Sequence, residues 1–258
     1  IIVCSKQLNS PTFLYTDREK NGVLEKSNKY IAKNDLEGKW VLDGKLDNIG
    51  EKRRFGDCFK VSAPVATLFN KVFVIKDFKG NEKWIEKDGY RLEKAGLRPA
   101  ASPKSMQYKE KNYIIFPYYY EENRLCRYDE EQFASLYPQI AGYLKQHAQK
   151  LSERKVDKNS KWFEFGRSQA LAHINQEKIM LSTLMTGKVK YYRLDKYTVP
   201  YSGMYLVPKE GYTIEQAEQV LDSEEFFRYI QEVGIHANGK TYRVSPRDIE
   251  NYVFEEKW

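Results

Sequence analysis

The pattern of hydrophobic and polar positions divides the chain into alternating β-like and helical stretches. Residues 1–50 are polar and rich in turn formers. The segment 55–78 that follows is rich in Val and interrupted by Pro64, which predicts strands. Residues 83–111 carry mixed charges and include LRPAASPKS, whose prolines and serines predict a loop. The segments NYIIFPYYY and RLCRY, separated by EEN, then predict a β-hairpin over 112–128.

Residues 129–156 show helical periodicity. Asp129 is a suitable N-cap, and Pro138 suits the first turn of a second helix. Four residues recur at helical spacing and form one apolar stripe: Ile140, Leu144, His147 and Leu151. Basic and polar side chains lie mostly off that stripe: Lys145, Gln149, Lys150 and Arg154. This second face is either solvated or directed at a nucleic acid, and the pattern does not decide between the two.

A second β-like block occupies residues 178–208, with the segments KIMLSTLM, KVKYYRLDKY and GMYLVP. Helices are predicted after it, because Thr213 and Gln216 form a capping-box pattern and Ser223 can cap a further helix that ends at Gly234. The order β, helix, β, helix favours an α+β fold over a regular βαβ repeat. We therefore expect a β-rich domain with a central helical segment and C-terminal helices.

The charge of the chain is positive and unevenly distributed. The 258 residues carry a formal net charge of +7, and 41% of them are hydrophobic, as in a globular protein. Residues 142–196 hold 12 Lys/Arg against 5 Asp/Glu, whereas residues 209–258 hold 6 against 11. A basic surplus favours polyanions, because each neutralised phosphate releases counterions. The middle of the chain is thus the predicted site of contact with a polyanion.

The cysteines and the apolar runs indicate in which cellular compartment the protein is expected. Cys4, Cys58 and Cys126 are widely separated and form no CxxC pair, so reduced thiols in a cytoplasmic protein are expected and a zinc site is not. No apolar run approaches the ~20 residues of a membrane span. The first residues, Ile1–Val3, resemble the cut end of a buried strand, from which we expect the chain to be a fragment of a longer protein.

Catalytic signatures are mostly missing from the sequence. Neither the GxxxxGK[ST] nor the GxGxxG phosphate loop occurs, there is no GxSxG elbow, and His147, His173 and His236 are far apart. Enzymes that methylate amino groups of DNA bases hold the base against an Asn/Asp-Pro-Pro-aromatic turn. The chain has nine prolines and no two are adjacent, so this turn cannot form. The chain is therefore not expected to transfer a methyl group by itself.

The segment KWFEFGRSQ, residues 161–169, combines cations with aromatic rings and a glycine. Arg167 could donate to guanine O6 and N7 or to a phosphate, and Trp162 could stack on a base. The alternative is that Trp162 and Phe165 belong to the core and that Arg167 makes a structural ion pair. The sequence leaves both interpretations open.

Six short segments occur in an order that is typical of one family. They are FGDCFKVSAPVATLFNKVFVI from Phe55; Glu93 with LRP at 97–99 and Lys104; YIIFPY at 113–118; Tyr-Pro, Tyr-Leu, Leu and Arg over 137–154; Trp162 with Gly166-Arg167; and YRVSP at 242–246. Over about residues 40–254 they resemble the TaqI-like C-terminal specificity domain of adenine-N6 DNA methyltransferases and fused type II restriction–modification enzymes. Two family motifs are altered, since APVATLF at 63–69 lacks the usual glycines and YVF at 252–254 replaces a closing Leu-Pro-x-Pro.

The resemblance implies an upstream methyltransferase domain of the same chain that binds S-adenosylmethionine and flips an adenine out of double-stranded DNA. The present fragment would hold no cofactor, act as a monomer and read base edges. Residues 1–50 are then expected to be the end of the catalytic domain and a linker. Residues 51–128 would form the first β-rich part of the recognition domain, and residues 129–258 the helix and the second β/α part.

The candidate DNA contacts are basic or aromatic side chains in loops and in the basic middle of the chain. The first choices are Arg98, Lys104, Lys161, Trp162, Arg167, Lys188, Lys190 and Arg193. Arg243 and Arg247 are second choices, because the sequence around them is acidic. Three alternatives remain: a parent that also carries a nuclease, a non-enzymatic subunit that binds protein, and RNA binding through the Tyr-rich strands.

Overall fold

The computed structural model describes residues 52–256 together with the backbone of two upstream strands, 12–18 and 26–32. The chain divides into two units, residues 1–49 and residues 50–258, which are described separately. In the first unit, β1 (Thr12–Arg18) pairs antiparallel with β2 (Lys26–Ala32). The strand end expected at 1–3 lies outside the described residues, as does most of the expected linker.

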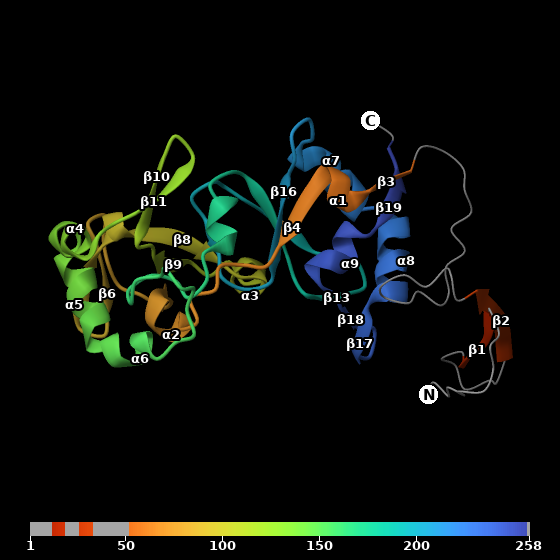
Figure 1. The fold of residues 1–258 in the computed structure, drawn as a ribbon, viewed down its shortest axis with the longest axis horizontal. Helices are drawn as coiled ribbons and strands as arrows, with labels where there is room; N and C mark the ends of the chain where they lie inside the picture. The colour runs from red at the N-terminus through yellow and green to blue at the C-terminus, as the bar shows by residue number, and fades with distance from the viewer. Residues whose placement is uncertain (1–11, 19–25, 33–51, 257–258) are drawn as a thin grey trace. The chain divides into compact units, whose positions relative to one another are not determined.

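The second unit mixes helices and strands, which confirms the α+β prediction (Figure 1). Its described helices are α1 (Phe55–Cys58), α2 (Asn70–Phe73), α3 (Pro103–Gln107), α4 (Glu130–Leu136), α5 (Pro138–Gln146), α6 (Ala148–Ser152), α7 (Ile214–Leu221), α8 (Glu224–Val233), α9 (Pro246–Glu250) and the 3-10 turns η2 (Lys94–Gly96) and η3 (Gln169–Ala172). In the described residues, no helix has the length and apolar character that crossing a membrane requires.

Most strands of the second unit are short. They are β3 (Lys52–Arg54), β4 (Phe59–Ser62), β5 (Val74–Ile75), β6 (Trp84–Lys87), β7 (Tyr90–Glu93), β8 (Leu97–Ala101), β9 (Asn112–Ile115), β10 (Tyr118–Glu121), β11 (Arg124–Arg127), β12 (Lys178–Leu181), β13 (Leu184–Thr186), β14 (Tyr191–Leu194), β15 (Val199–Pro200), β16 (Met204–Pro208), β17 (Ile235–Asn238), β18 (Thr241–Arg243) and β19 (Val253–Glu255).

The strands form two four-stranded sheets and several smaller ones. The first has the order β14-β12-β16-β4 and is antiparallel throughout, so that β4 lies beside β16 from the other end of the unit (Figure 1). The second has the order β15-β8-β9-β5, with a parallel pair between β15 and β8. The smaller sheets are β13-β18-β17, β10-β11, β6-β7 and β19-β3.

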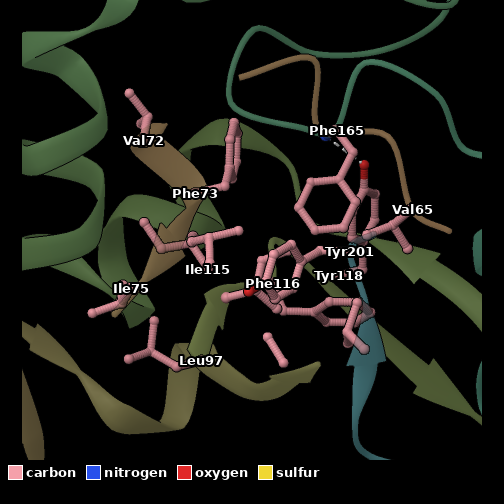
Figure 2. Packing of buried hydrophobic residues seen from close by; sticks show 14 of the residues in the cluster. Val65, Val72, Phe73, Ile75, Leu97, Ile115, Phe116, Tyr118, Phe165 and Tyr201 are labelled. Carbon is pink, nitrogen blue, oxygen red and sulfur yellow. Dashed lines mark hydrogen bonds between the residues drawn. The ribbon is translucent and has the colours of Figure 1, made fainter. Parts of the chain in front are cut away.

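Two large hydrophobic clusters hold the second unit together. In the first, the rings of Phe73, Phe116 and Tyr118 surround Phe165 edge-on at centroid distances of 5.3–6.0 Å (Figure 2). The hydroxyl of Tyr118 accepts a hydrogen bond from the Phe165 amide at 2.8 Å, so the buried polar group is satisfied. Aromatic pairs of this kind contribute ~0.5–1.5 kcal/mol beyond their burial.

The second cluster joins the two ends of the unit. Phe55 of α1 lies 4.6 Å from Phe59 of β4 and 6.3 Å from Phe226 of α8, measured between ring centroids. The cluster continues through Met204 and Leu206 of β16. Both clusters therefore take residues from both sides of position 128, and the predicted division at 128/129 stays a prediction.

The predicted helix signals are confirmed. Asp129 accepts from the Gln132 amide and forms a capping box, Pro138 occupies the first turn of α5, Thr213 caps α7 and Ser223 caps α8. These signals are local, since each capping side chain bonds an amide three residues ahead.

Two predictions of local structure are wrong. Within 55–78, expected as strand, two four-residue stretches are helical. Phe55 and Cys58 are both buried in α1, because a spacing of three puts them on one face of a helical turn. LRPAASPKS, expected as a loop, forms β8 and α3 instead. Pro99 fits in β8 because β15 pairs only with Ala100 and Ala101, so its missing N–H breaks no ladder bond there.

Candidate nucleic-acid interface

Arg98 of β8 places a cation against two aromatic rings. Its guanidinium carbon lies 4.1 Å from the ring centroid of Phe116 and 5.0 Å from that of Tyr120. Burial lowers the pKa of Arg98, and its buried Nη1 has no hydrogen-bond partner among the described residues. No described carboxylate forms an ion pair with it. A partly desolvated cation is thus held by ring faces and is not neutralised.

An open hollow with a volume of about 310 Å³ lies beside this arginine. Its walls come from β8, the β10–β11 turn, the stretch after η3 and the loop between β14 and β15. The lining residues are Arg98, Tyr120, Glu122, Asn123, Asn175, Lys196 and Tyr197.

The β10–β11 turn forms one wall of the hollow. Glu122 and Asn123 have φ angles of 47° and 66°, the left-handed pair that a two-residue hairpin turn requires. The side-chain amide of Asn175 donates to Asn123 Oδ1 at 3.0 Å and ties the turn to the stretch after η3. The hydroxyl of Tyr120 donates to the Leu171 carbonyl at 2.6 Å, which fixes the ring on which Arg98 stacks.

The loop between β14 and β15 forms the opposite wall and is held by Lys178. This lysine is fully buried, and its Nζ donates to the carbonyls of Asp195 at 2.5 Å and Thr198 at 3.1 Å. Burial lowers the pKa of Lys178 to about 8. Asp195 Oδ1 also accepts from the amides of Tyr197 and Thr198. These bonds set Lys196 and the half-exposed Tyr197 at the rim of the hollow.

The segment 161–169 is tied into the fold. Phe165 is fully buried, and Trp162 packs against the first cluster. Lys161 Nζ donates to the Tyr128 carbonyl, and Arg167 donates to the Lys155 carbonyl at 2.5 Å and lies 3.4 Å from Asp157. The geometry therefore agrees with the structural interpretation of this segment. A DNA contact by Lys161, Trp162 or Arg167 stays a prediction.

Arg154 differs from the other basic and polar side chains of 129–156, for which a solvated face and a face directed at a nucleic acid both stay open. Its guanidinium donates to the carbonyls of Thr67 at 2.5 Å, Trp162 at 2.7 Å and Glu164 at 3.0 Å, and lies 5.4 Å from the Phe73 ring centroid. This side chain points into the fold, whereas Lys145, Gln149 and Lys150 are exposed.

The other predicted contacts are dispersed over the second unit. Arg193 of β14 pairs with Glu215 at 2.8 Å and also bonds Glu218 of the same helix, α7, so its charge is already matched. The remaining predicted side chains are exposed: Lys104 on α3, Lys188 and Lys190 between β13 and β14, Arg243 on β18 and Arg247 on α9. Of the residues predicted from sequence, Arg98 alone among the described ones lines the hollow.

Seven residues that line the hollow or support it were not among the candidates from sequence: Tyr120, Glu122, Asn123, Asn175, Lys178, Lys196 and Tyr197. The turn EEN was a signal for Asn123, and the basic stretch 142–196 contains Lys178 and Lys196. Nothing local distinguishes Asn175 from any polar loop residue, because its role depends on a contact 52 residues away.

Comparison with known proteins relates the chain to restriction–modification enzymes. No family model matches it. It is 22% identical over 179 residues to the Type II restriction enzyme and methyltransferase RM.Eco57I of Escherichia coli, a match that covers 59% of this chain and 18% of that protein. The fold is similar to that of the Type IIL restriction–modification enzyme MmeI, solved in complex with DNA. The TM-score is 0.53 at 12% identity, and the match covers 94% of this chain and 30% of that chain. In sequence and in fold, the chain is therefore related to a part of restriction–modification enzymes and spans less than a third of either relative.

Proposed function

We propose that this chain is the DNA-recognition domain of a restriction–modification enzyme. The parent enzyme would methylate adenine at N6, using S-adenosylmethionine bound by a domain upstream of residues 52–256. The recognition domain would hold double-stranded DNA and carry no cofactor of its own. Its relationship to RM.Eco57I and to the DNA-bound MmeI fold supports this assignment, as does the TaqI-like order of its motifs.

The unneutralised Arg98 beside the open hollow is the observation that carries the proposal. A half-buried guanidinium costs free energy unless a partner compensates it, and here the aromatic rings compensate only part. A DNA phosphate would supply the missing acceptor through a charge-assisted hydrogen bond. Lys196 and the amides of Asn123 and Asn175 line the same hollow and suit phosphate oxygens. Glu122 also lines it and sets a limit on how close an anion can approach on that side.

The other predicted contacts have different parts in this proposal. The exposed Lys104, Lys188 and Lys190 would meet phosphates, since contacts of this kind position the duplex without reading its sequence. Lys161, Trp162, Arg167 and Arg193 would act mainly by shaping the surface, because their polar groups or rings are engaged within the fold.

Duplex binding tests the proposal directly. The 258-residue chain would be titrated into a labelled 30-bp duplex with a randomised centre, and anisotropy would be followed at several salt concentrations. We expect affinity to fall steeply with salt, by about 0.9 in log K per log salt for each phosphate contact. Arg98→Gln should weaken binding and reduce the slope by about 1. The control is Arg228→Gln on α8, which removes one positive charge as Arg98→Gln does. Arg228 is exposed and, among the described residues, pairs only with Glu225.

Two results would overturn the assignment. One is absence of duplex binding by the wild-type chain at low salt, and the other is preference for single-stranded RNA of the same length, which would favour the RNA alternative. The adenine-N6 part is tested in the full-length enzyme by incubation with radiolabelled S-adenosylmethionine and duplex DNA, followed by nucleoside analysis. Label in any product other than N6-methyladenine would contradict it.

A further inference from the structure

The small sheet β13-β18-β17 exposes a row of three side chains that the hollow does not involve. In the strand register, Leu184 of β13 and Ile235 of β17 both lie opposite Arg243 of β18. Directly opposed residues project from the same face of a sheet, so the arginine stands between two apolar side chains. Leu184 is 44% exposed and Ile235 is 64% exposed.

The outward direction of this row follows from the burial of its neighbours. Met185 and Tyr242 alternate with the row and are 4% and 3% exposed, because they pack into the second hydrophobic cluster. A second outward row follows, in which the hydroxyls of Thr186 and Thr241 lie 2.7 Å apart. The outer face therefore combines apolar, hydroxyl and guanidinium groups, none of which is needed to fill the core.

Charge distinguishes this sheet from its surroundings. Residues 183–190 and 235–244 contain four cations and no Asp or Glu: Lys188, Lys190, Lys240 and Arg243. The stretch 209–258 as a whole holds 11 acidic against 6 basic residues. Arg243 forms no ion pair among the described residues. Lys188 and Lys190 belong to the basic stretch 142–196, whereas Lys240 and Arg243 are cations within the acidic stretch. The sheet is thus a locally basic surface, and a polyanion is the partner that matches it.

We propose that this face reads the edges of base pairs in a DNA major groove, an inference that rests on the proposed function. Neighbouring strands lie ~4.8 Å apart, and a major groove about 12 Å wide admits a β-ribbon of two strands, so β18 can enter it with the flanking strands at its rims. Arg243 donates to O6 and N7 of a guanine, the pairing that suits a planar guanidinium. Leu184 and Ile235 contact thymine methyl groups on either side, and Lys188 and Lys240 meet the flanking phosphates.

Selection from a random duplex library tests this reading. The wild-type chain and its variants would be bound to 40-bp duplexes with a 14-bp randomised centre, and bound molecules sequenced over successive rounds. We expect the wild type to enrich a motif that contains a G·C pair flanked by A·T pairs. Arg243→Gln should reduce the preference for that G·C pair roughly 5- to 150-fold. The double variant Leu184→Thr, Ile235→Thr should relax the flanking positions and keep the G·C pair.

Matched controls and a fold check make the outcomes distinct. Arg228→Gln on α8 and Leu136→Thr on α4 remove an exposed charge and an exposed apolar side chain elsewhere, and both should keep the full motif. Thermal melting should show every variant folded, since the substituted positions are exposed. The inference is overturned if Arg243→Gln keeps the wild-type motif, or if it weakens all sequences equally, as a phosphate contact would. With either result, loss of duplex affinity in Arg98→Gln still supports the proposed function. Failure of the wild type to bind any duplex refutes both this inference and the proposed function.

Discussion

Replacement of Arg154 by methionine is expected to destabilise the second unit by about 3–4 kcal/mol. The guanidinium joins the segment of Trp162 and Glu164 to the distant Thr67, because it donates to the carbonyls of all three at 2.5–3.0 Å. Hydrogen bonds to charged groups contribute ~1.5–3 kcal/mol each, and buried carbonyls that lose a partner keep their desolvation penalty. The Thr67 carbonyl also accepts from the Gly166 amide at 3.3 Å, so its lost bond to Arg154 costs less free energy than those of Trp162 and Glu164. The unbranched methionine side chain can still pack beside Phe73, whose ring centroid lies 5.4 Å from the guanidinium carbon of Arg154.

The measurement is reversible unfolding in urea together with thermal melting. For a unit of this size, 1 kcal/mol shifts Tm by ~2–4 °C, so a decrease of about 10 °C is expected. Lys150→Met on α6 is the matched control, because Lys150 is exposed and its loss should change stability by no more than ~0.5 kcal/mol. Equal stability of Arg154→Met and Lys150→Met would refute the reasoning. If such a stable Arg154→Met variant also lost duplex affinity, the guanidinium would belong to the DNA surface after all.

Three further predictions concern the pH response, a glycine and an ion pair. The folded pKa of Lys178, about 8, lies below its unfolded value of 10.5. Between these two pH values the unfolded state binds more protons, so the free energy of unfolding rises with pH. Between pH 7.5 and pH 9.5 it should rise by about 1–2 kcal/mol in the wild type, and Lys178→Met should lack this gain. A Cβ at Gly203, where φ is +82°, would meet the Leu181 carbonyl oxygen at 2.4 Å, whereas Gly187, at φ +70°, has open space, so calorimetry should show a larger Tm loss for Gly203→Ala than for Gly187→Ala. Arg193→Gln should weaken duplex binding less than Arg98→Gln in the same anisotropy titration, and an equal loss would show that its carboxylate partners release it to DNA.

The sequence predicted the elements whose signals are local. The ends of α4, α7 and α8 follow from Asp129, Thr213 and Ser223, because an N-cap and its amide partner are three residues apart. β8 was missed because its formation depends on a distant strand. Pro99 would break a central strand that was paired along its whole length. It is tolerated in β8 because β15 has only two residues and pairs only with Ala100 and Ala101.

The candidate site was less predictable than the fold. Arg98 could be selected as a basic residue in a matching motif, but its stacking on Phe116 and Tyr120 depends on the pairing of β8 with β9 and on the hairpin that follows. Lys178 was not selected from sequence, because a lysine in the strand KIML predicts an exposed position. It is buried because the carbonyls of Asp195 and Thr198, 17 and 20 residues further on, receive its ammonium group.

The pairing of β19 with β3 brings the start and the end of the second unit together, with Val253 opposite Arg54. The two junctions with any neighbouring sequence therefore lie at one edge, about one strand spacing apart. A folded unit of this kind can be inserted into a loop of a host protein without stretching that loop, because the host sees only a short gap. Residues 52–256 can therefore be entered and left at two adjacent strands, although their interior is assembled from segments far apart in the chain.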